Sequence, residues 1–233
     1  MTGGWLTVAL PKGRLAAEAA ELAAAAGLGH DLDPTARALI QEQPDLRLRF
    51  AWLRPEDALT YVERGVAALA FVGKDVLGER RAAVDEVVDL GIGRCSACLA
   101  VPRASAWPPA AGAGGRLRVA THLPRLAEGF LRQQGYAADI IQLRGSVEIA
   151  PRLGLADAVV DLVQTGRTLE ANGLRVVAEI LPVSCRLVVH PGVRRGGDAR
   201  VEEVIARLAR AAAAFRDAGR GAEEVVGDAH RAR

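Results

Sequence analysis

Residues 148–169 read EIAPRLGLADAVVDLVQTGRTL, and they contain the clearest pattern of the chain. Glu148 comes first and is followed by a turn at Gly154. A short apolar segment of strand length comes next and has Asp161 near its end. The turn 164–168, Gln-Thr-Gly-Arg-Thr, then opens a short helix. A strand that leads through a tight turn into a helix is the repeating unit of an α/β fold.

The chemistry of this turn suits a phosphate group. Backbone N–H groups at a helix start have no acceptor within the helix, and they carry partial positive charge. Thr165 and Thr168 add hydroxyl donors, and Gly166 permits close approach of a ligand to the backbone. Asp161 is placed to accept hydrogen bonds from ribose hydroxyls or to help hold a metal. The pattern predicts a site for a phosphorylated sugar; the alternative is an ordinary βα turn with a threonine N-cap.

Strand and helix patterns alternate along the whole chain. Apolar segments of strand length occur at residues 6–10, 46–53, 67–72, 86–90, 97–101, 117–121, 140–143, 158–162, 176–180 and 186–190. Helical patterns, several of them bounded by proline or glycine, lie at residues 14–26, 55–64, 124–134, 147–153, 168–172 and 201–218. This alternation predicts an α/β fold with mostly parallel sheets.

Two breaks in the pattern indicate lobes. The Pro/Gly-rich loop 102–116 and the junction near Ser184 are candidate boundaries. We expect lobe I to comprise residues 1–95, with residues 184–218 returning to it, and lobe II to comprise residues 96–183. The polar tail, residues 219–233, is a candidate for disorder.

Composition limits the function classes. The chain has 233 residues, half of them apolar and a quarter charged, which is typical of a soluble globular protein. A net charge of +2 argues against a nucleic-acid-binding protein that relies on bulk electrostatics. The sequence shows no run of 18 apolar residues and no secretory pattern at its start, and its three cysteines suit a reducing compartment. We therefore expect a cytoplasmic protein without a membrane span.

The cysteine and histidine spacing does not favour a metal centre. Cys95 and Cys98 have the C-x2-C spacing of a zinc site, but their segment has a strand pattern, and residues three apart on a strand point to opposite faces. No second cysteine pair completes a site, and the four histidines show no metal-ligand spacing. We predict structural thiols rather than zinc. No serine lies in a G-x-S-x-G context, which leaves hydrolase chemistry without support.

Basic residues recur in turns that follow strands. Lys12 and Arg14 lie in the Pro-Lys-Gly-Arg turn after the first strand, and Arg54 follows the strand 46–53. Arg37 lies in a separate Pro-Thr-Ala-Arg turn. Open α/β sheets bind ligands at the carboxyl ends of their strands. Each residue alone is more often a solvated surface side chain, but together they suit polyphosphate groups.

These motifs resemble those of the ATP phosphoribosyltransferase family. The family signature runs from a Glu through a Gly and an Asp to [Ser/Thr]-Gly-x-Thr-[Leu/Met]. The chain meets it with Glu148, Gly154, Asp161, Thr165, Gly166, Thr168 and Leu169. LPKGRL at residues 10–15, RPEDALTYVERG at 54–65 and VGKDVL at 72–77 also occur in the family's order. The resemblance covers roughly residues 5–215.

The chain departs from the family pattern at three positions. Ala68 and Ala70 stand where the family usually has an Asp and a Gly before VGKD. His122 stands where the family usually has the lysine of Thr-Lys-Tyr-Pro. A ligand contact made by that lysine does not carry over to this chain.

The resemblance implies a bilobal fold like that of type II periplasmic binding proteins. It implies transfer of a phosphoribosyl group from phosphoribosyl pyrophosphate to N1 of ATP, the first step of histidine biosynthesis, with Mg²⁺ on the pyrophosphate. The chain also resembles the short form of the family, without an added regulatory domain. Short-form relatives form homo- and hetero-oligomers with a regulatory subunit similar to histidyl-tRNA synthetase, so we expect such a partner.

The resemblance also assigns roles to individual residues. We expect catalytic cations at Lys12, Arg14 and Arg54, and substrate contacts from Arg37, Glu148, Asp161, Thr165, Gly166, Arg167 and Thr168, with no protein metal ligand. The turn 165–168 would bind the 5-phosphate, and the two acids the ribose hydroxyls. Two alternatives stay open: a non-catalytic anion-binding protein on the same scaffold, and a phosphoribosyltransferase for another base.

Overall fold

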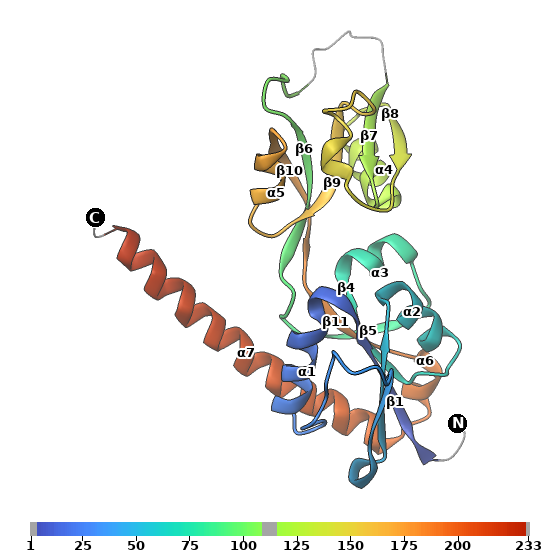
Figure 1. Ribbon diagram of the computed structural model, residues 1–233. Helices are drawn as coiled ribbons and strands as arrows, with labels where there is room; N and C mark the ends of the chain where they lie inside the picture. The colour runs from blue at the N-terminus through green and yellow to red at the C-terminus, as the bar shows by residue number, and fades with distance from the viewer. Residues whose placement is uncertain (1–3, 109–115, 232–233) are drawn as a thin grey trace. The chain divides into compact units, whose positions relative to one another are not determined.

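The chain forms two compact units (Figure 1). The computed structural model describes residues 4–108 and 116–231, and the side chains of the last helix as far as Arg216. Unit 1 comprises Met1–Val76, Arg80–Gly93 and Ser184–Arg233, and unit 2 comprises Leu77–Glu79 and Arg94–Val183. The chain passes between the units at Gly93/Arg94 and at Val183/Ser184, and the lobe division expected from the sequence, at 95/96 and 183/184, stays a prediction.

Unit 1 is built on a six-stranded mixed sheet. Its strand order is β2 (Ile40–Gln43), β3 (Leu48–Leu53), β1 (Leu6–Pro11), β4 (Leu69–Gly73), β11 (Cys185–Val189) and β5 (Asp85–Asp89). β1 pairs in parallel with β3 and with β4, and the other three pairings are antiparallel. The carboxyl ends of β1, β3 and β4 therefore lie at one edge of the sheet.

Helices cover both faces of this sheet. α1 (Ala16–Ala25) and α7 (Ala199–Arg231) pack on the face that carries Leu6, Val8 and Leu10, and α2 (Pro55–Glu63) covers the other face (Figure 1). Alternate residues of β1 point to opposite faces, which is why one strand serves both layers. The unit also contains the short helices η2 (Gly13–Leu15), η3 (Pro44–Leu46) and α6 (Pro191–Arg195), and the ends of α3 (Lys74–Arg80), whose residues Leu77–Glu79 are counted with unit 2.

Unit 2 is built on a five-stranded mixed sheet. Its order is β10 (Leu174–Val183), β6 (Cys95–Pro102), β9 (Ala158–Val163), β7 (Leu117–Thr121) and β8 (Ala138–Gln142). β7 pairs in parallel with β8 and β9, whereas β6 pairs antiparallel with β9 and β10. One face packs against α4 (Pro124–Gln133), and the other against η4 (Val147–Ile149) and α5 (Arg167–Ala171).

The expectation of mostly parallel sheets was wrong in this respect, since both sheets are mixed. Parallel neighbours require a long crossover connection, usually a helix. β2 and β3 are joined only by the short η3 and therefore pair antiparallel. β6, β10 and β11 begin or end at the links between the units. No crossover helix at these links carries the chain back to start a parallel strand, so these strands pair antiparallel with their neighbours.

Several local features differ from the sequence pattern. β2, α3 and α6 were not expected, because each is too short to show a clear period. α7 continues to Arg231, beyond the expected end at residue 218, so the segment proposed as a disordered tail is assigned as helix. No helix in the described part of the chain has the length and hydropathy needed to cross a membrane.

The cysteines lie within strands. Cys98 and Cys185 are buried, Cys95 is partly exposed, and none of the three forms a disulfide with a described residue. Burial raises the pKa of the Cys98 and Cys185 thiols. The described residues contain no group of three or more His, Cys, Asp or Glu side chains placed to hold a metal ion.

Asp89 joins the two segments of unit 1 that lead to unit 2. Its Oδ1 accepts hydrogen bonds from the Ser184 hydroxyl at 2.8 Å and from the Gly91 N–H at 2.9 Å. The Arg186 guanidinium lies 3.3 Å from its Oδ2, and Arg216 of α7 donates to its carbonyl oxygen. Partial burial raises the pKa of Asp89, but these hydrogen bonds and the two guanidinium groups outweigh it and hold the pKa below its usual range.

We predict that Asp89→Asn lowers the free energy of unfolding at pH 7. The amide keeps the size of the side chain but removes the charge that Arg186 and Ser184 contact. Because the side chain is 41% exposed, we expect a loss of only about 1–2 kcal/mol in urea denaturation. Asp85→Asn, on the same strand, is the matched control and should have little effect.

The loss of stability in Asp89→Asn should also depend on pH. A carboxylate whose folded-state pKa is lowered stabilises the protein above its unfolded pKa, near 4, and this contribution disappears as the pH falls through the folded pKa. The stability difference between wild type and Asp89→Asn should therefore be largest at neutral pH and shrink below about pH 4. A difference that is constant down to pH 3 would contradict this account.

Candidate functional site

Asp161 lies near the carboxyl end of β9. β7 and β9 run parallel with Thr121 paired to Val160, so both strands end at the same edge of the unit 2 sheet. Val160 packs on the α4 side, whereas Val159 packs on the side of η4 and α5. Because side chains alternate along a strand, Asp161 faces η4 and α5. The Asp161 side chain is 24% exposed, so it is partly buried but open to a ligand.

The carboxylate of Asp161 has one oxygen occupied and one open. Oδ1 accepts the Leu162 N–H at 2.8 Å and lies 3.5 Å from Nδ1 of His122. Oδ2 receives no hydrogen bond from any residue that the structure describes. Burial raises the pKa of Asp161, and the nearby Glu148 raises it further, although the Leu162 N–H and His122 oppose the change. Glu148, on η4, is therefore close enough to act electrostatically on Asp161.

The turn after β9 has the predicted form. Gly166 is the N-cap of α5 with a φ of 76°, a left-handed conformation that a side chain would strain. Thr165, Arg167 and Thr168 are exposed, whereas Leu169 is buried and anchors the helix to the sheet. The structure thus brings Glu148, Asp161 and the turn together in unit 2, with the polar groups outward.

Thr121 fixes the alignment of this edge. It is fully buried, and its hydroxyl donates to the Val160 carbonyl oxygen at 2.8 Å and accepts the Leu123 N–H at 2.8 Å. One contact reaches the backbone of β9 and the other the backbone just after β7, so one side chain ties the end of β7 to β9. The residues that follow, His122 on one strand and Asp161 on the other, are held side by side as a result.

Two cations share the carboxyl edge of the unit 1 sheet. Pro11 pairs with Leu53 across β1 and β3, and the Lys12 N–H donates to the Leu53 carbonyl at 2.9 Å. Lys12 is therefore next to Arg54, the N-cap residue of α2. Both are exposed, and neither forms an ion pair with any side chain described within 4–108 or 116–216. By contrast, Lys74 is paired with Glu86 at 2.6 Å.

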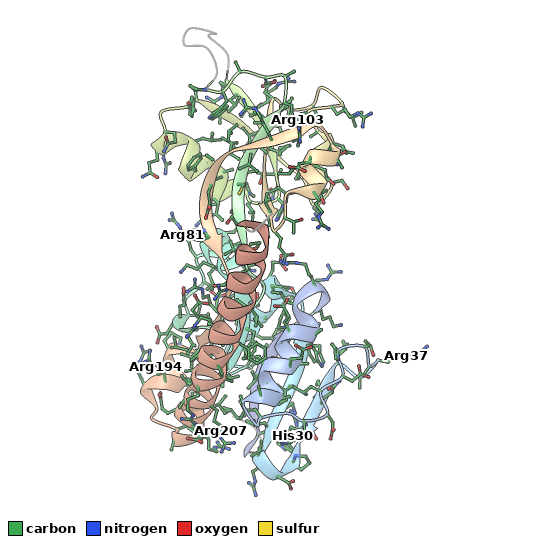
Figure 2. The ribbon with its side chains drawn as sticks, turned by 90° about the vertical axis from the view of Figure 1, so that its left-hand side faces the viewer. His30, Arg37, Arg81, Arg103, Arg194 and Arg207 are labelled. Atoms are coloured by element: carbon green, nitrogen blue, oxygen red, sulfur yellow. The ribbon has the colours of Figure 1, made fainter. Side chains whose placement is uncertain are left out.

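The other two predicted cations have different positions. Arg14 lies in η2, directly after Lys12 and Gly13, and is exposed. Arg37 lies on the loop between α1 and β2, with its side chain directed away from the unit (Figure 2). The structure therefore places Lys12 beside Arg54, with Arg14 two residues after Lys12 in η2, and Arg37 on a loop of its own.

Comparison with known proteins identifies the family. A family model described as ATP phosphoribosyltransferase matches residues 54–210. This chain belongs to the ATP phosphoribosyltransferase family. It is 43% identical over 210 residues to the ATP phosphoribosyltransferase of Bacillus pumilus, which covers 89% of this chain and 96% of the relative. It is 42% identical over 232 residues to that of Moorella thermoacetica, which covers 97% and 99%.

Solved structures agree with this family and with the bilobal fold. The ATP phosphoribosyl transferase (HisG:HisZ) complex from Thermotoga maritima contains a chain that is 30% identical, with a TM-score of 0.76, covering 89% of this chain and 97% of that one. The periplasmic aliphatic sulphonate binding protein SsuA from Escherichia coli matches with a TM-score of 0.61 at 15% identity, covering 94% of this chain and 76% of that one, which shows the fold alone. The expectation of an α/β fold like that of periplasmic binding proteins is confirmed.

Two residues beside Asp161, Thr121 and His122, were not predicted to contribute to the site. Thr121 was seen only as the end of a strand, and His122 only as a departure from the family pattern. A usable signal was present, because both follow an apolar strand and precede the proline that starts α4. The same signal drew attention to Lys12 and Arg54.

We predict that Thr121→Val destabilises the enzyme. Valine has nearly the same shape, but it leaves the Val160 carbonyl and the Leu123 N–H without the hydroxyl that joins them. The free energy of unfolding should fall by about 1–3 kcal/mol in urea denaturation. Thr7→Val, on β1, is the control, because the Thr7 hydroxyl forms no hydrogen bond with a described residue. Equal losses in the two variants would show that the Thr121 bridge has no special role.

Proposed function

We propose that this chain transfers the phosphoribosyl group of phosphoribosyl pyrophosphate to N1 of ATP. The products are 1-(5-phosphoribosyl)-ATP and pyrophosphate, and the reaction is the first step of histidine biosynthesis. Family membership carries the proposal, since relatives named ATP phosphoribosyltransferase match nearly the whole chain at 42–43% identity. The arrangement around Asp161 supplies groups that the phosphoribosyl donor requires.

The unit 2 edge suits the phosphoribosyl group. The open Oδ2 of Asp161 would accept hydrogen bonds from the ribose hydroxyls, and Glu148 would support it from η4. The 5-phosphate would lie against the turn formed by Thr165, Gly166, Arg167 and Thr168, where exposed hydroxyls and backbone N–H groups act as donors. A plain anion binder has no use for acids directed at a sugar, which favours the transferase over that alternative.

The unit 1 edge suits phosphates. Lys12, Arg14 and Arg54 present cations at the ends of parallel strands, and Arg37 would contact phosphates from its loop. The leaving group is a polyanion, so the rate depends on groups that stabilise its developing negative charge. N1 of adenine already carries a lone pair, and little acid–base chemistry is required. The cluster favours ATP over an uncharged free base as the second substrate.

A metal ion serves catalysis in this family, and we propose Mg²⁺. The described residues provide no cluster of three or more ligands. Mg²⁺ is commonly held by substrate phosphates and water, with few protein ligands. The residues present therefore fit a metal that is carried by the pyrophosphate, and we assign it no protein ligand. When bound, it would neutralise negative charge on the leaving group.

We also propose a regulatory partner and a cellular location. The Thermotoga maritima structure is a HisG:HisZ complex, and the match to this chain covers 97% of the Thermotoga maritima chain. We propose that this chain joins a regulatory subunit of the same kind, resembling histidyl-tRNA synthetase, in a homo- and hetero-oligomer. Cysteines that form no disulfide with a described residue and nucleotide substrates both suit the cytoplasm.

We predict that Asp161→Asn reduces kcat/KM for phosphoribosyl pyrophosphate by about 100-fold or more, because an amide replaces the charged acceptor of the ribose hydroxyls. Pyrophosphate release would be followed with ATP and Mg²⁺, with and without the regulatory subunit. The circular dichroism spectrum should match that of wild type. Near-normal turnover by the variant would reject the assignment of Asp161, and failure of the wild-type enzyme to turn over would reject the proposed reaction.

We further predict that Lys12→Gln and Arg54→Gln each lower kcat/KM by at least about tenfold, because each removes a cation from the edge where phosphates would bind. Arg194→Gln is the matched control. Arg194 lies on α6, which follows β11 and therefore starts at the opposite edge of the same sheet (Figure 2). The same pyrophosphate assay applies. Equal losses in all three variants would indicate a general effect of net charge.

A further inference from the structure

His122 lies beside Asp161, and the assignment above gives it no role. The residue follows β7 directly, and Thr121 holds that strand to β9. On β7, Val119 packs towards α4 and Ala120 towards α5, so continued alternation puts His122 on the same face as Asp161. The pair is 3.5 Å apart between Nδ1 and Oδ1, with the imidazole 33% exposed.

We infer that His122 is a positioning residue for phosphoribosyl pyrophosphate. Its imidazole restrains the Asp161 carboxylate from the Oδ1 side and leaves Oδ2 directed at the ribose hydroxyls. The inference rests on the proposed function, since it concerns the same site. His122 touches the acid and not the reacting atoms, so it acts on binding through Asp161.

The position of Oδ1 between the Leu162 N–H and the His122 imidazole supports this role. The Leu162 N–H reaches Oδ1 at 2.8 Å, and His122 approaches the same oxygen from the neighbouring strand. Contacts from two segments to one oxygen limit rotation of the carboxylate, whereas a single contact does not. A restrained acceptor loses less conformational entropy when the ligand binds.

The charges around the pair give His122 a second effect. Glu148, on η4, acts on Asp161 with the same sign of charge, and burial adds to its effect in raising the pKa of Asp161. Cys98 is opposite Asp161 on β6, and burial and Glu179 of β10 raise the pKa of its thiol, which keeps it uncharged at neutral pH. Within the described residues, His122 is the one side chain that acts on Asp161 in the opposite direction.

Replacing His122 should therefore change the pKa of Asp161 in a predictable direction. Without the imidazole, burial and Glu148 act unopposed, and the pKa of Asp161 rises further. A protonated carboxyl group is a poorer acceptor for ribose hydroxyls. Binding of phosphoribosyl pyrophosphate should then weaken at a higher pH than in the wild-type enzyme.

The test compares His122→Gln, His122→Lys and wild type between pH 5 and 9. For His122→Gln we expect KM and calorimetric Kd for phosphoribosyl pyrophosphate to rise about tenfold at pH 6 and less at pH 8, with kcat and KM for ATP nearly unchanged. The acid limb of kcat/KM should move to higher pH. His122→Lys, which places an ammonium group beside Asp161, should recover most of the affinity and move the limb back.

A control variant and two contrary outcomes distinguish the role of His122 from the proposed reaction. His30→Gln, an exposed histidine of unit 1 that Figure 2 labels, should match wild type throughout. If wild type binds phosphoribosyl pyrophosphate but His122→Gln shows unchanged KM and an unchanged acid limb, the role of His122 is rejected while the reaction stands. If wild type does not bind this ligand, the proposed function fails, and the role of His122 fails with it.

Discussion

The parallel register of β7 with β9 is the constraint on which the candidate site depends. Thr121 is paired with Val160, so the two strands end together, and the buried hydroxyl of Thr121 locks that alignment. This register fixes the positions of the residues that come directly after the two strands. His122 and Asp161 emerge side by side on one face, and the chain continues from β9 into the turn at Gly166. A shift of one residue in this register would turn Asp161 to the α4 face.

In unit 1 as well, parallel strands end together and place side chains at one sheet edge, but these side chains are cations rather than acids. β1 and β3 also end together, and the residues that follow are Lys12 and Arg54. One sheet edge therefore presents acids and hydrogen-bond donors for a sugar phosphate, and the other presents cations for phosphates. This division suits a reaction in which one substrate carries a ribose to be held and both substrates carry polyanionic groups. The edges are supplied by separate sheets, so each can be altered without changing the other's core.

Much of this could be predicted from the sequence, because the information is local. The alternation of apolar segments and helical patterns predicts the α/β class, and the acid, glycine and threonines of residues 148–169 are near one another in the chain. What the sequence did not reveal depends on pairing between distant segments. Thr121 and Val160 are 39 residues apart, so the bridge between them leaves no local pattern. The mixed sheets have the same origin, because β6, β10 and β11 take their direction from the links between the units. The position of Arg37 depends on the path of the loop between α1 and β2, which its turn pattern does not show, and its contact with phosphates stays a prediction.

The most direct test of the central claim is the position of phosphoribosyl pyrophosphate on the intact chain. Backbone amide NMR shifts of isotopically labelled protein, recorded as the ligand is added with Mg²⁺, report that position residue by residue. We expect the largest shifts at the amides of Leu162 and of residues 165–168, with inorganic sulfate shifting only the turn. Shifts confined to other parts of the chain, with Leu162 and the turn unchanged at saturating ligand, would contradict it.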